Sequence, residues 1–284
     1  KIIVANGRCS DTTGSITISL GALYRIRIED SNGTEIVAAQ ITTDDTLTLC
    51  LRGYDADNNL IGDIVGNWTV SGGSPSGRGL ENCSPGYGTS TVFDPTKPSA
   101  GTITATDGLH TDTICPVTVR LGALSYIRIE HLDGTEAGAT QTTTDSSIAL
   151  YLRGYDVDNN LIGDVVGTWT VDGGIGTCSS GYGSSTTLYL ITPGMGTITA
   201  DDGVHTDTIG TITVEHGQIV CLTLTPGTFT LTADNSLQYI AIAKDADGNL
   251  WDVTEKVVWS EDDPIGTMAD SIYYAGRTGN WTIT

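Results

Sequence analysis

Short segments of the chain alternate between hydrophobic and polar residues with a period of two, which is the pattern of strands with one buried face. Clear examples are residues 26–28 and 47–52, and residues 127–129 and 148–152 repeat both of them. No window combines a 3.6-residue hydrophobic period with helix caps. The pattern therefore predicts an all-β protein.

One motif returns along the chain. Residues 51–63 come back almost unchanged as residues 152–164, at an offset of 101 residues (152 − 51), and residues 244–250 form a weaker third copy. A repeat of roughly 90–100 residues has the size of a domain and is too long for one coil of a solenoid. Each copy is followed by a strand-like segment that contains a tryptophan: Trp68, Trp169 and Trp259.

Each repeat holds about seven short strand patterns with regular turns, which is typical of a β-sandwich. The last two strands of a repeat meet at an Asp-Gly or Asn-Gly pair, the strongest short hairpin signal. A Gly/Ser-rich loop near residues 71–88 interrupts the first repeat. We expect a terminal strand pair followed by three domains: 1–20, 21–120, 121–215 and 216–284.

The two ends of the chain are out of phase with these domains. Residues 2–7 and 14–18 match the last two strands of a repeat, and residues 281–284 stop inside the equivalent of 197–199. We therefore expect the third domain to lack its last strand. Two explanations stay open: the chain is an excerpt of a longer tandem array, or the amino-terminal strands of one subunit complete the third domain of the next. Either would remove an open sheet edge.

Residues 101–105 and 196–200 both read Gly-Thr-Ile-Thr-Ala, and residues 281–284 match them in part. Together with the Gly-Tyr-Asp turn and the Trp-Thr-Val strand, this order resembles the bacterial immunoglobulin-like (Big) domain. That domain occurs in tandem in invasin- and intimin-like adhesins and other cell-surface proteins. The resemblance implies tandem immunoglobulin-like sandwiches and an extracellular or cell-surface location. It says little about function, because the family supplies spacers, stalks, adhesins and filaments alike.

The net charge of −21 and the pI near 4.1 narrow the choice of partners. Nucleic-acid binding needs a basic face, and anionic membranes repel an acidic protein. No apolar run is long enough to span a bilayer, so membrane insertion is not expected. The composition permits cations, although the same charge suits a soluble, self-repelling surface. No cofactor is required, and calcium is the one that the sequence allows.

The calcium candidates are the oxygen-bearing side chains of the repeated turn, because a hard cation prefers oxygen ligands at alternating positions. No bidentate glutamate ends the loop as in an EF-hand, and the same residue types form ordinary turns by local hydrogen bonding. Both interpretations therefore stay open for two sets of residues: Asp55, Asp57, Asn59 and Asp63, and Asp156, Asp158, Asn160 and Asp164.

The six cysteines form no CxxC pair, which argues against zinc or thioredoxin-type chemistry and suits an oxidising compartment. If the strands alternate in direction, the loop that carries Cys83 faces the hairpin beside Cys115, so these two form the leading pair. The same argument predicts an inter-chain disulfide between Cys178 and Cys9. It assigns no partner to Cys50 and Cys221.

Four Asn-x-Ser/Thr triplets are candidates for glycosylation, although a chain rich in serine and threonine contains such triplets by chance. Their asparagines are Asn32, Asn67, Asn82 and Asn280.

No nucleophile, base and orienting group occur together in the sequence, so we do not expect an enzyme. The main hypothesis is an extracellular structural protein, a subunit or segment of a surface filament or stalk built from immunoglobulin-like domains. Its partners would be other copies of itself or flanking repeats, with donor-strand complementation as the way of joining. The alternative is an adhesin-type binding module carried on such a stalk.

Overall fold

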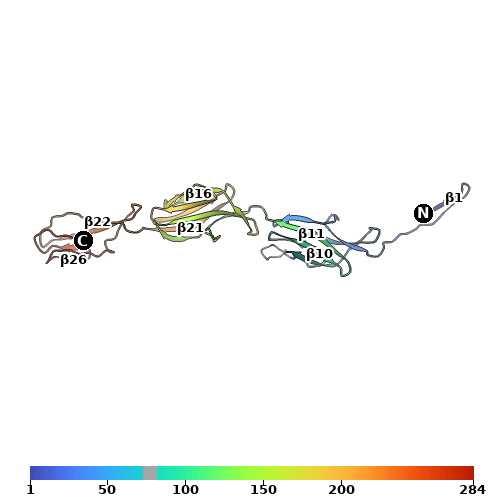
Figure 1. Ribbon diagram of the computed structural model, residues 1–284, viewed down its shortest axis with the longest axis horizontal. Helices are drawn as coiled ribbons and strands as arrows, with labels where there is room; N and C mark the ends of the chain where they lie inside the picture. The colour runs from blue at the N-terminus through green and yellow to red at the C-terminus, as the bar shows by residue number, and fades with distance from the viewer. Residues whose placement is uncertain (73–81) are drawn as a thin grey trace. The chain divides into compact units, whose positions relative to one another are not determined.

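The computed structural model describes residues 1–72 and 82–284, which form 27 strands and, over those two ranges, no helix (Figure 1). The prediction of an all-β fold is therefore confirmed. Within these residues no helix that could cross a membrane is found. Part of the predicted Gly/Ser-rich loop, residues 73–81, lies outside the described residues.

The chain divides into two compact units. The first comprises residues 1–125 together with 155–162, and the second comprises residues 126–154 and 163–284. Residues 155–162, which form the turn within the second copy of the motif, thus pack with the first unit. The predicted domain limits differ from this division and stay predictions.

The first sandwich is built from nine strands in two sheets. One sheet has the order β3-β5-β6, with β9 also paired to β5, and the other has the order β4-β11-β10-β7-β8. In the second sheet β4 runs parallel to β11, and the other pairs are antiparallel. The strands are β3 (Arg25–Glu29), β4 (Ala39–Thr42), β5 (Leu47–Tyr54), β6 (Leu60–Asp63), β7 (Gly66–Gly72), β8 (Tyr87–Gly88), β9 (Ser90–Phe93), β10 (Ser99–Thr106) and β11 (Thr111–Arg120).

Alternating residues from both sheets fill the core of this sandwich. Leu49 and Leu51 on β5 pack with Ile103 on β10 and Val117 on β11, and all four side chains are fully buried. Trp68 on β7 joins the same cluster and donates from Nε1 to the carbonyl of Gly88 at 3.2 Å. This division of strands between two facing sheets is the immunoglobulin-like arrangement.

The second sandwich repeats this topology. Its sheets have the orders β12-β14-β19-β17, with β15 paired to β14, and β13-β21-β20-β16-β18. Trp169 on β16 is buried like Trp68. The strands are β12 (Tyr126–Glu130), β13 (Thr140–Thr143), β14 (Ser147–Tyr155), β15 (Leu161–Asp164), β16 (Gly167–Asp172), β17 (Gly176–Cys178), β18 (Tyr182–Gly183), β19 (Ser185–Leu190), β20 (Gly194–Asp201) and β21 (Thr206–Glu215).

The third sandwich contains two separate three-stranded sheets, with the orders β22-β24-β25 and β23-β27-β26. By their place in the repeat, these strands correspond to the sheet of β12, β14, β15, β17 and β19 in the second sandwich. At the place of the second sheet of the other sandwiches, Glu261 and Ile283 form one isolated bridge, and Trp259 packs against the core of the third sandwich while remaining partly buried. The strands are β22 (Cys221–Thr225), β23 (Ser236–Gln238), β24 (Ile240–Lys244), β25 (Leu250–Asp252), β26 (Thr267–Ala269) and β27 (Ile272–Tyr274).

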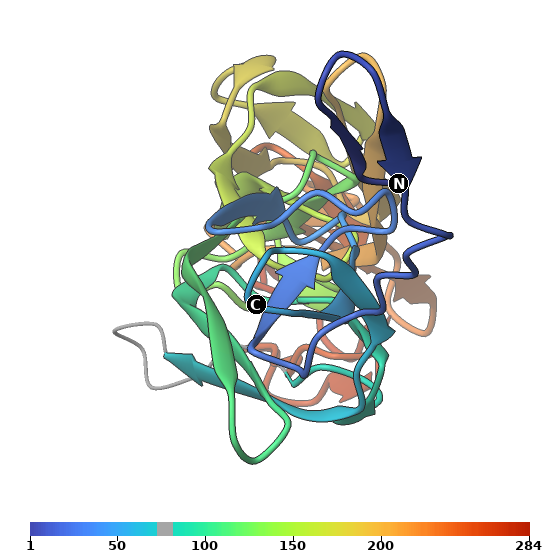
Figure 2. The same ribbon diagram turned by 90° about the vertical axis from the view of Figure 1, so that its right-hand side faces the viewer.

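The chain begins with a separate antiparallel hairpin of β1 (Ile3–Ala5) and β2 (Ser10–Thr12), drawn in dark blue in Figure 2. Every residue of both strands is exposed, and so are all residues from 1 to 20. Ile16 and Ile18 occupy the positions of Val117 and Val119 at the 101-residue offset, and those two valines are buried in the first sandwich. The hairpin therefore has the sequence pattern of a core-forming strand pair without a core of its own.

Candidate functional site: the repeated aspartate turn

The repeated motif forms a compact turn around one buried carboxylate. In the first copy Asp55 is buried, and its Oδ1 accepts hydrogen bonds from the backbone N–H groups of Asp57 at 3.1 Å and Asn59 at 2.8 Å. The Nδ2 of Asn59 donates to Oδ2 at 2.9 Å, and the N–H of Gly21 donates to the same oxygen at 3.1 Å. Asn58 adopts a φ of 67°, which asparagine tolerates better than most residues. The Asp-x-Asp-Asn-Asn pattern thus encodes a turn that holds itself together.

The second copy keeps these internal bonds and adds partners from a distant part of the first unit. Oδ2 of Asp156 accepts a hydrogen bond from the hydroxyl of Thr43 at 2.7 Å and another from the N–H of Gly122 at 3.3 Å. Thr43 follows β4 in the first sandwich, whereas Asp156 follows β14. The turn of the second copy therefore packs with the first sandwich, inside the first unit.

Asn160 and Lys97 complete this connection. Nδ2 of Asn160 donates to the carbonyl of Thr96 at 2.9 Å, and Nζ of Lys97 donates to Oδ1 of Asn160 at 2.9 Å. Lys97 also reaches the carbonyl of Asp158 at 3.3 Å. Asn160 is buried in this arrangement, whereas the equivalent Asn59 of the first copy is exposed. We call this set of contacts, from Thr43, Asp44, Thr96, Lys97 and the linker to the turn, the latch.

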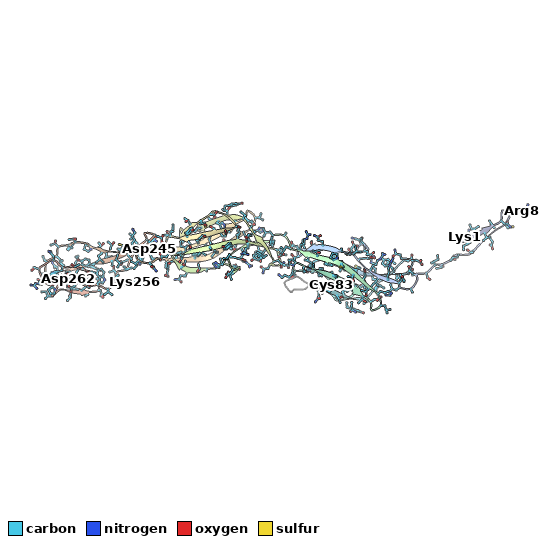
Figure 3. The ribbon with its side chains drawn as sticks, viewed as in Figure 1. Lys1, Arg8, Cys83, Asp245, Lys256 and Asp262 are labelled. Carbon is cyan, nitrogen blue, oxygen red and sulfur yellow. The ribbon has the colours of Figure 1, made fainter. Side chains whose placement is uncertain are left out.

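The third copy forms the same latch inside the second unit. The hydroxyl of Thr144 donates to Oδ2 of Asp245 at 2.9 Å, and the N–H of Gly217 donates to that oxygen at 3.3 Å. Nδ2 of Asn249 donates to the carbonyl of Ile191 at 3.0 Å. Asp245 is labelled in Figure 3. The second and third copies of the motif therefore make equivalent contacts, each to the sandwich that precedes it in the chain.

The linker takes part in the latch through its backbone. The N–H of Ala123 donates to the carboxylate of Asp44 at 2.7 Å, and the N–H of Gln218 donates to Asp145 at 2.7 Å. The approach is so close that a Cβ on Gly122 would lie 2.0 Å from Oδ1 of Asp44. Glycine at this position of the linker lets the Asp44 carboxylate approach, because any side chain here would force that carboxylate to move.

The environment keeps these carboxylates ionised. Burial opposes ionisation of Asp245, but the hydrogen bonds from Asn249, Thr144 and Gly217 outweigh it and lower the pKa to about 2. The pKa of Asp156 is lowered in the same way, since donors from Asn160, Thr43 and Gly122 outweigh its burial. A charged carboxylate that accepts several N–H and O–H groups makes stronger hydrogen bonds than a neutral pair.

The turn uses its oxygens differently from a calcium loop. N–H and hydroxyl donors face both oxygens of Asp55 and Asp156, where a cation would have to replace them. Asp63 instead lies 3.7 Å from the guanidinium of Arg52, and Asp164 ends β15 in an exposed position. Among the described residues, no group of three or more His, Cys, Asp or Glu side chains is placed to hold a metal ion. The geometry favours the hydrogen-bonded turn, and calcium binding stays a prediction.

The cysteines are all free thiols, so no disulfide supports the predicted pairing of Cys83 with Cys115. Cys83, labelled in Figure 3, is buried in the first core, and burial raises the pKa of its thiol. Cys115 is exposed on β11. The inter-chain pair of Cys178, which is partly buried, with the exposed Cys9 stays a prediction.

Glycosylation also stays a prediction. The four candidate asparagines are all exposed: Asn32, Asn67, Asn82 and Asn280.

Thr43, Thr144 and Lys97 are the site residues that sequence reasoning missed. A signal was present, because residues 42–44 and 143–145 both read Thr-Thr-Asp at the offset of the repeat. Threonine is common throughout this chain, so the pattern did not stand out. Its partner lies 113 residues along the chain in one latch and 101 in the other.

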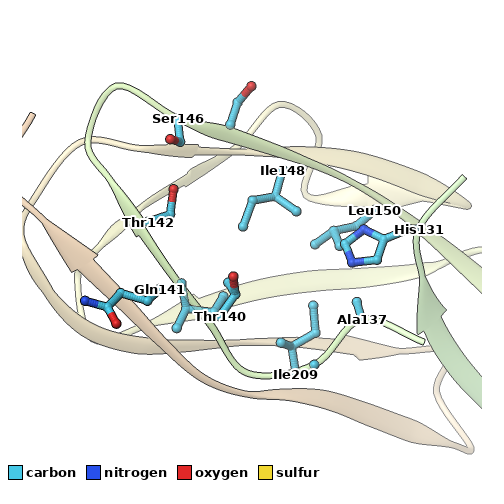
Figure 4. A pocket seen from close by; sticks show the side chains of 12 residues that line it. His131, Ala137, Thr140, Gln141, Thr142, Ser146, Ile148, Leu150 and Ile209 are labelled. Atoms are coloured by element: carbon cyan, nitrogen blue, oxygen red, sulfur yellow. The ribbon is translucent and has the colours of Figure 1, made fainter. Parts of the chain in front are cut away.

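The second sandwich also contains a cavity of about 280 Å³ (Figure 4). Its lining includes Ala137, Thr142, Ile148 and Ile209. The first sandwich has Ile36 and Ile41 where the second has Ala137 and Thr142, and both isoleucines pack against the first core. The cavity therefore results from smaller side chains at two repeat positions.

Comparison with known proteins gave no matching family and no matching curated protein. Among solved structures, the chain is similar to invasin, a bacterial integrin-binding protein, with 14% identity over 92% of this chain and 56% of that one, at a TM-score of 0.41. It is also similar to the Escherichia coli adhesin FdeC, with 16% identity over 94% of each chain, at a TM-score of 0.38.

Domains 1–6 of the surface layer protein SbsC match with 18% identity at a TM-score of 0.26. The match covers 94% of this chain but only 38% of that one, so the chain spans less than half the length of this structure. These low scores carry no argument about function. The immunoglobulin-like fold follows from the strand order of the first two sandwiches.

Proposed function

We propose that the protein is an extracellular structural protein whose copies join head to tail through residues 1–20. In this proposal the amino-terminal hairpin of one copy completes the third sandwich of another. The observation that carries the proposal is the unformed second sheet of that sandwich. In the first two sandwiches β4 and β13 pair in parallel with β11 and β21, whereas the equivalent residues 229–232 belong to no strand.

The place of the missing strand is a groove lined by both apolar and polar residues. A cavity of about 670 Å³ runs along the third sandwich, and its lining includes Leu224, Phe229, Leu231, Trp281 and Ile283. Phe229 is 57% exposed, a large value for a residue at a core-facing position. An unpaired strand edge beside exposed apolar side chains favours the addition of a further strand.

Residues 15–18, which follow the hairpin, have a hydrophobic pattern that fits the apolar part of this groove. Ile16 and Ile18 are 54% and 91% exposed, and their repeat equivalents Val117 and Val119 are buried. Burying large aliphatic side chains contributes about 1.5–3 kcal/mol each. The alternation of these residues with Ser15 and Thr17 sets which face would point inward.

A polar contact would help to fix the register of the donated strand. In the first two sandwiches Asp112 and Asp207, next to the terminal hairpin, accept a hydrogen bond from the backbone of the first strand, at Ile28 and Ile129, both at 2.6 Å. Asp11 is the equivalent residue of the amino-terminal hairpin. In a completed third sandwich it would meet the backbone of Leu224, which already lines the groove.

Deleting residues 1–20 tests the proposal. We expect the full chain to form concentration-dependent, head-to-tail assemblies by sedimentation and electron microscopy, and the truncated chain to remain a monomer that binds added peptide 1–20. Ile18→Asp should abolish assembly because it places a charge against the apolar side chains of the groove. Thr17→Asp, on the outward face, is the matched control and should assemble normally.

Equal assembly of the full and truncated chains would rule out hairpin donation. An intact mass of the native protein well above 29.7 kDa would instead support a flanking repeat of a longer chain as the strand that fills the groove.

A further inference from the structure

We propose that the first aspartate turn is a third latch, which receives the end of the third sandwich of a second copy of the chain. The inference rests on the proposed function, because hairpin donation would place those two parts next to each other in sequence order. It adds a second, chemically distinct contact to the junction between copies: a polar latch around Asp55.

The first turn has the parts of a latch but lacks the partners. Oδ2 of Asp156 accepts a threonine hydroxyl, and Oδ2 of Asp55 has no such donor among the described residues. Asn160 donates to a carbonyl of the preceding sandwich, whereas Asn59 is exposed and is bonded only within its own turn. Asp55 is nevertheless buried, with 3% of its surface exposed, and the donors to its carboxylate come from its own turn and from Gly21.

The linker glycine gives an independent reason to expect a partner. A Cβ on Gly122 would lie 2.0 Å from Asp44, and a Cβ on Gly217 would lie 2.6 Å from Asp145. On Gly21 the nearest atom would be Cβ of Asp55 at 3.2 Å. In the other two linkers an aspartate lies close to the glycine. The chain keeps a glycine at Gly21 but places no such aspartate beside it.

The register of the repeats indicates which residues of the second copy would contact the first turn. Strand pairing aligns Phe93, Leu188 and Tyr273, because they pair with the equivalent residues Leu47, Ile148 and Leu237. Three and four positions later come Thr96 and Lys97 in the first sandwich and Gly276 and Arg277 in the third. The carbonyl of Gly276 would accept from Asn59, and Arg277 would stand where Lys97 contacts the second turn.

Charge supports this choice in a very acidic protein. Arg277 is exposed and is one of only 13 Lys and Arg residues in the chain. At the position of Lys97 it would face Asp57, the equivalent of Asp158. Asp234 takes the place of Asp44 and would accept from the exposed N–H of Ala22. One contact is missing, because Ala233 replaces the donating Thr43 and Thr144.

Two substitutions test the latch from opposite directions in the full chain. Gly21→Ala should leave the thermal midpoint unchanged and weaken head-to-tail assembly at least tenfold in critical concentration, since the new methyl group would occupy the place of Asp234. Ala233→Thr should supply the missing hydroxyl and lower the critical concentration. In the Asp55→Asn background, Ala233→Thr should lose most of its effect. Gly138→Ala, at an open position of the second sandwich with no atom within 4 Å of the added Cβ and no positive φ, serves as the assembly control.

The outcomes separate the latch from hairpin donation. If deletion of residues 1–20 abolishes assembly while Gly21→Ala and Ala233→Thr leave it unchanged, hairpin donation stands and the latch is wrong. If assembly survives the deletion but responds to both substitutions, the latch stands and hairpin donation is wrong. Absence of any self-association by the full chain would overturn both, as would a flanking repeat found seated at Asp55 in place of a second copy.

Discussion

The hydroxyl of Thr144 donates a 2.9 Å hydrogen bond to the carboxylate of Asp245, and both side chains are buried. Thr43 and Asp156 make the same contact at 2.7 Å. In each case the threonine precedes a linker and the aspartate begins the first motif turn after that linker, so the bond closes a loop of 113 or 101 residues. A buried charge without such donors would be strongly unfavourable, so these pairs also determine which arrangements of the linker the chain can adopt.

Thr144→Val should destabilise the connection around Asp245. The substitution keeps the shape of the side chain but removes the one hydroxyl donor to that carboxylate among the described residues, and a hydrogen bond to a charged group contributes about 1.5–3 kcal/mol. We expect a lower unfolding midpoint for the third sandwich by calorimetry. Thr170→Val, at an exposed position of β16, is the control and should have little effect.

The latch at Asp245 should weaken in acid. Its pKa in the folded protein is about 2, below the ordinary aspartate value of 3.8. The group therefore contributes stability that is fully present above about pH 4 and is lost as the pH falls through about 2. Urea unfolding of the wild type between about pH 5 and pH 2 should show this loss, and Asp245→Asn should show a smaller pH dependence over that range. Equal slopes for the two proteins would contradict the assignment.

Ala137→Ile should stabilise the second sandwich. Ile36 fills the equivalent position in the first sandwich, whereas Ala137 leaves part of a cavity of about 280 Å³. Filling a cavity with a side chain that the fold already accommodates commonly gains about 0.5–2 kcal/mol. The reverse substitution, Ile36→Ala, should destabilise the first sandwich. A fall in the melting temperature of Ala137→Ile would show that the space cannot accept the larger side chain.

Trp169→Ala should cost on the order of 3–5 kcal/mol, because the ring is buried and its removal leaves a large cavity. Trp259→Ala should cost less in the isolated chain, since Trp259 is only partly buried. If a donated strand completes the third sandwich, the cost of Trp259→Ala should rise in the assembled protein. Calorimetry of both variants before and after assembly measures the difference.

Local pattern was sufficient for much of the fold. The alternation at residues 47–52 and 148–152 predicted β5 and β14, and Trp68 and Trp169 are buried as expected. Trp259 also packs against a core, but it is only partly buried and its expected strand does not form. A strand needs a paired neighbour that can lie far along the chain, and no local pattern supplies one.

The sequence by itself determined the repeat, the strand pattern and the turn around each motif aspartate, because these depend on residues a few positions apart. Only the tertiary structure decided what the turns do. Asp156 and Asp245 look like the same turn as Asp55, yet they accept hydroxyl groups from 113 and 101 residues away, respectively, and Asp55 does not. The difference depends on contacts between residues about one hundred positions apart, which the preferences of a single segment do not specify.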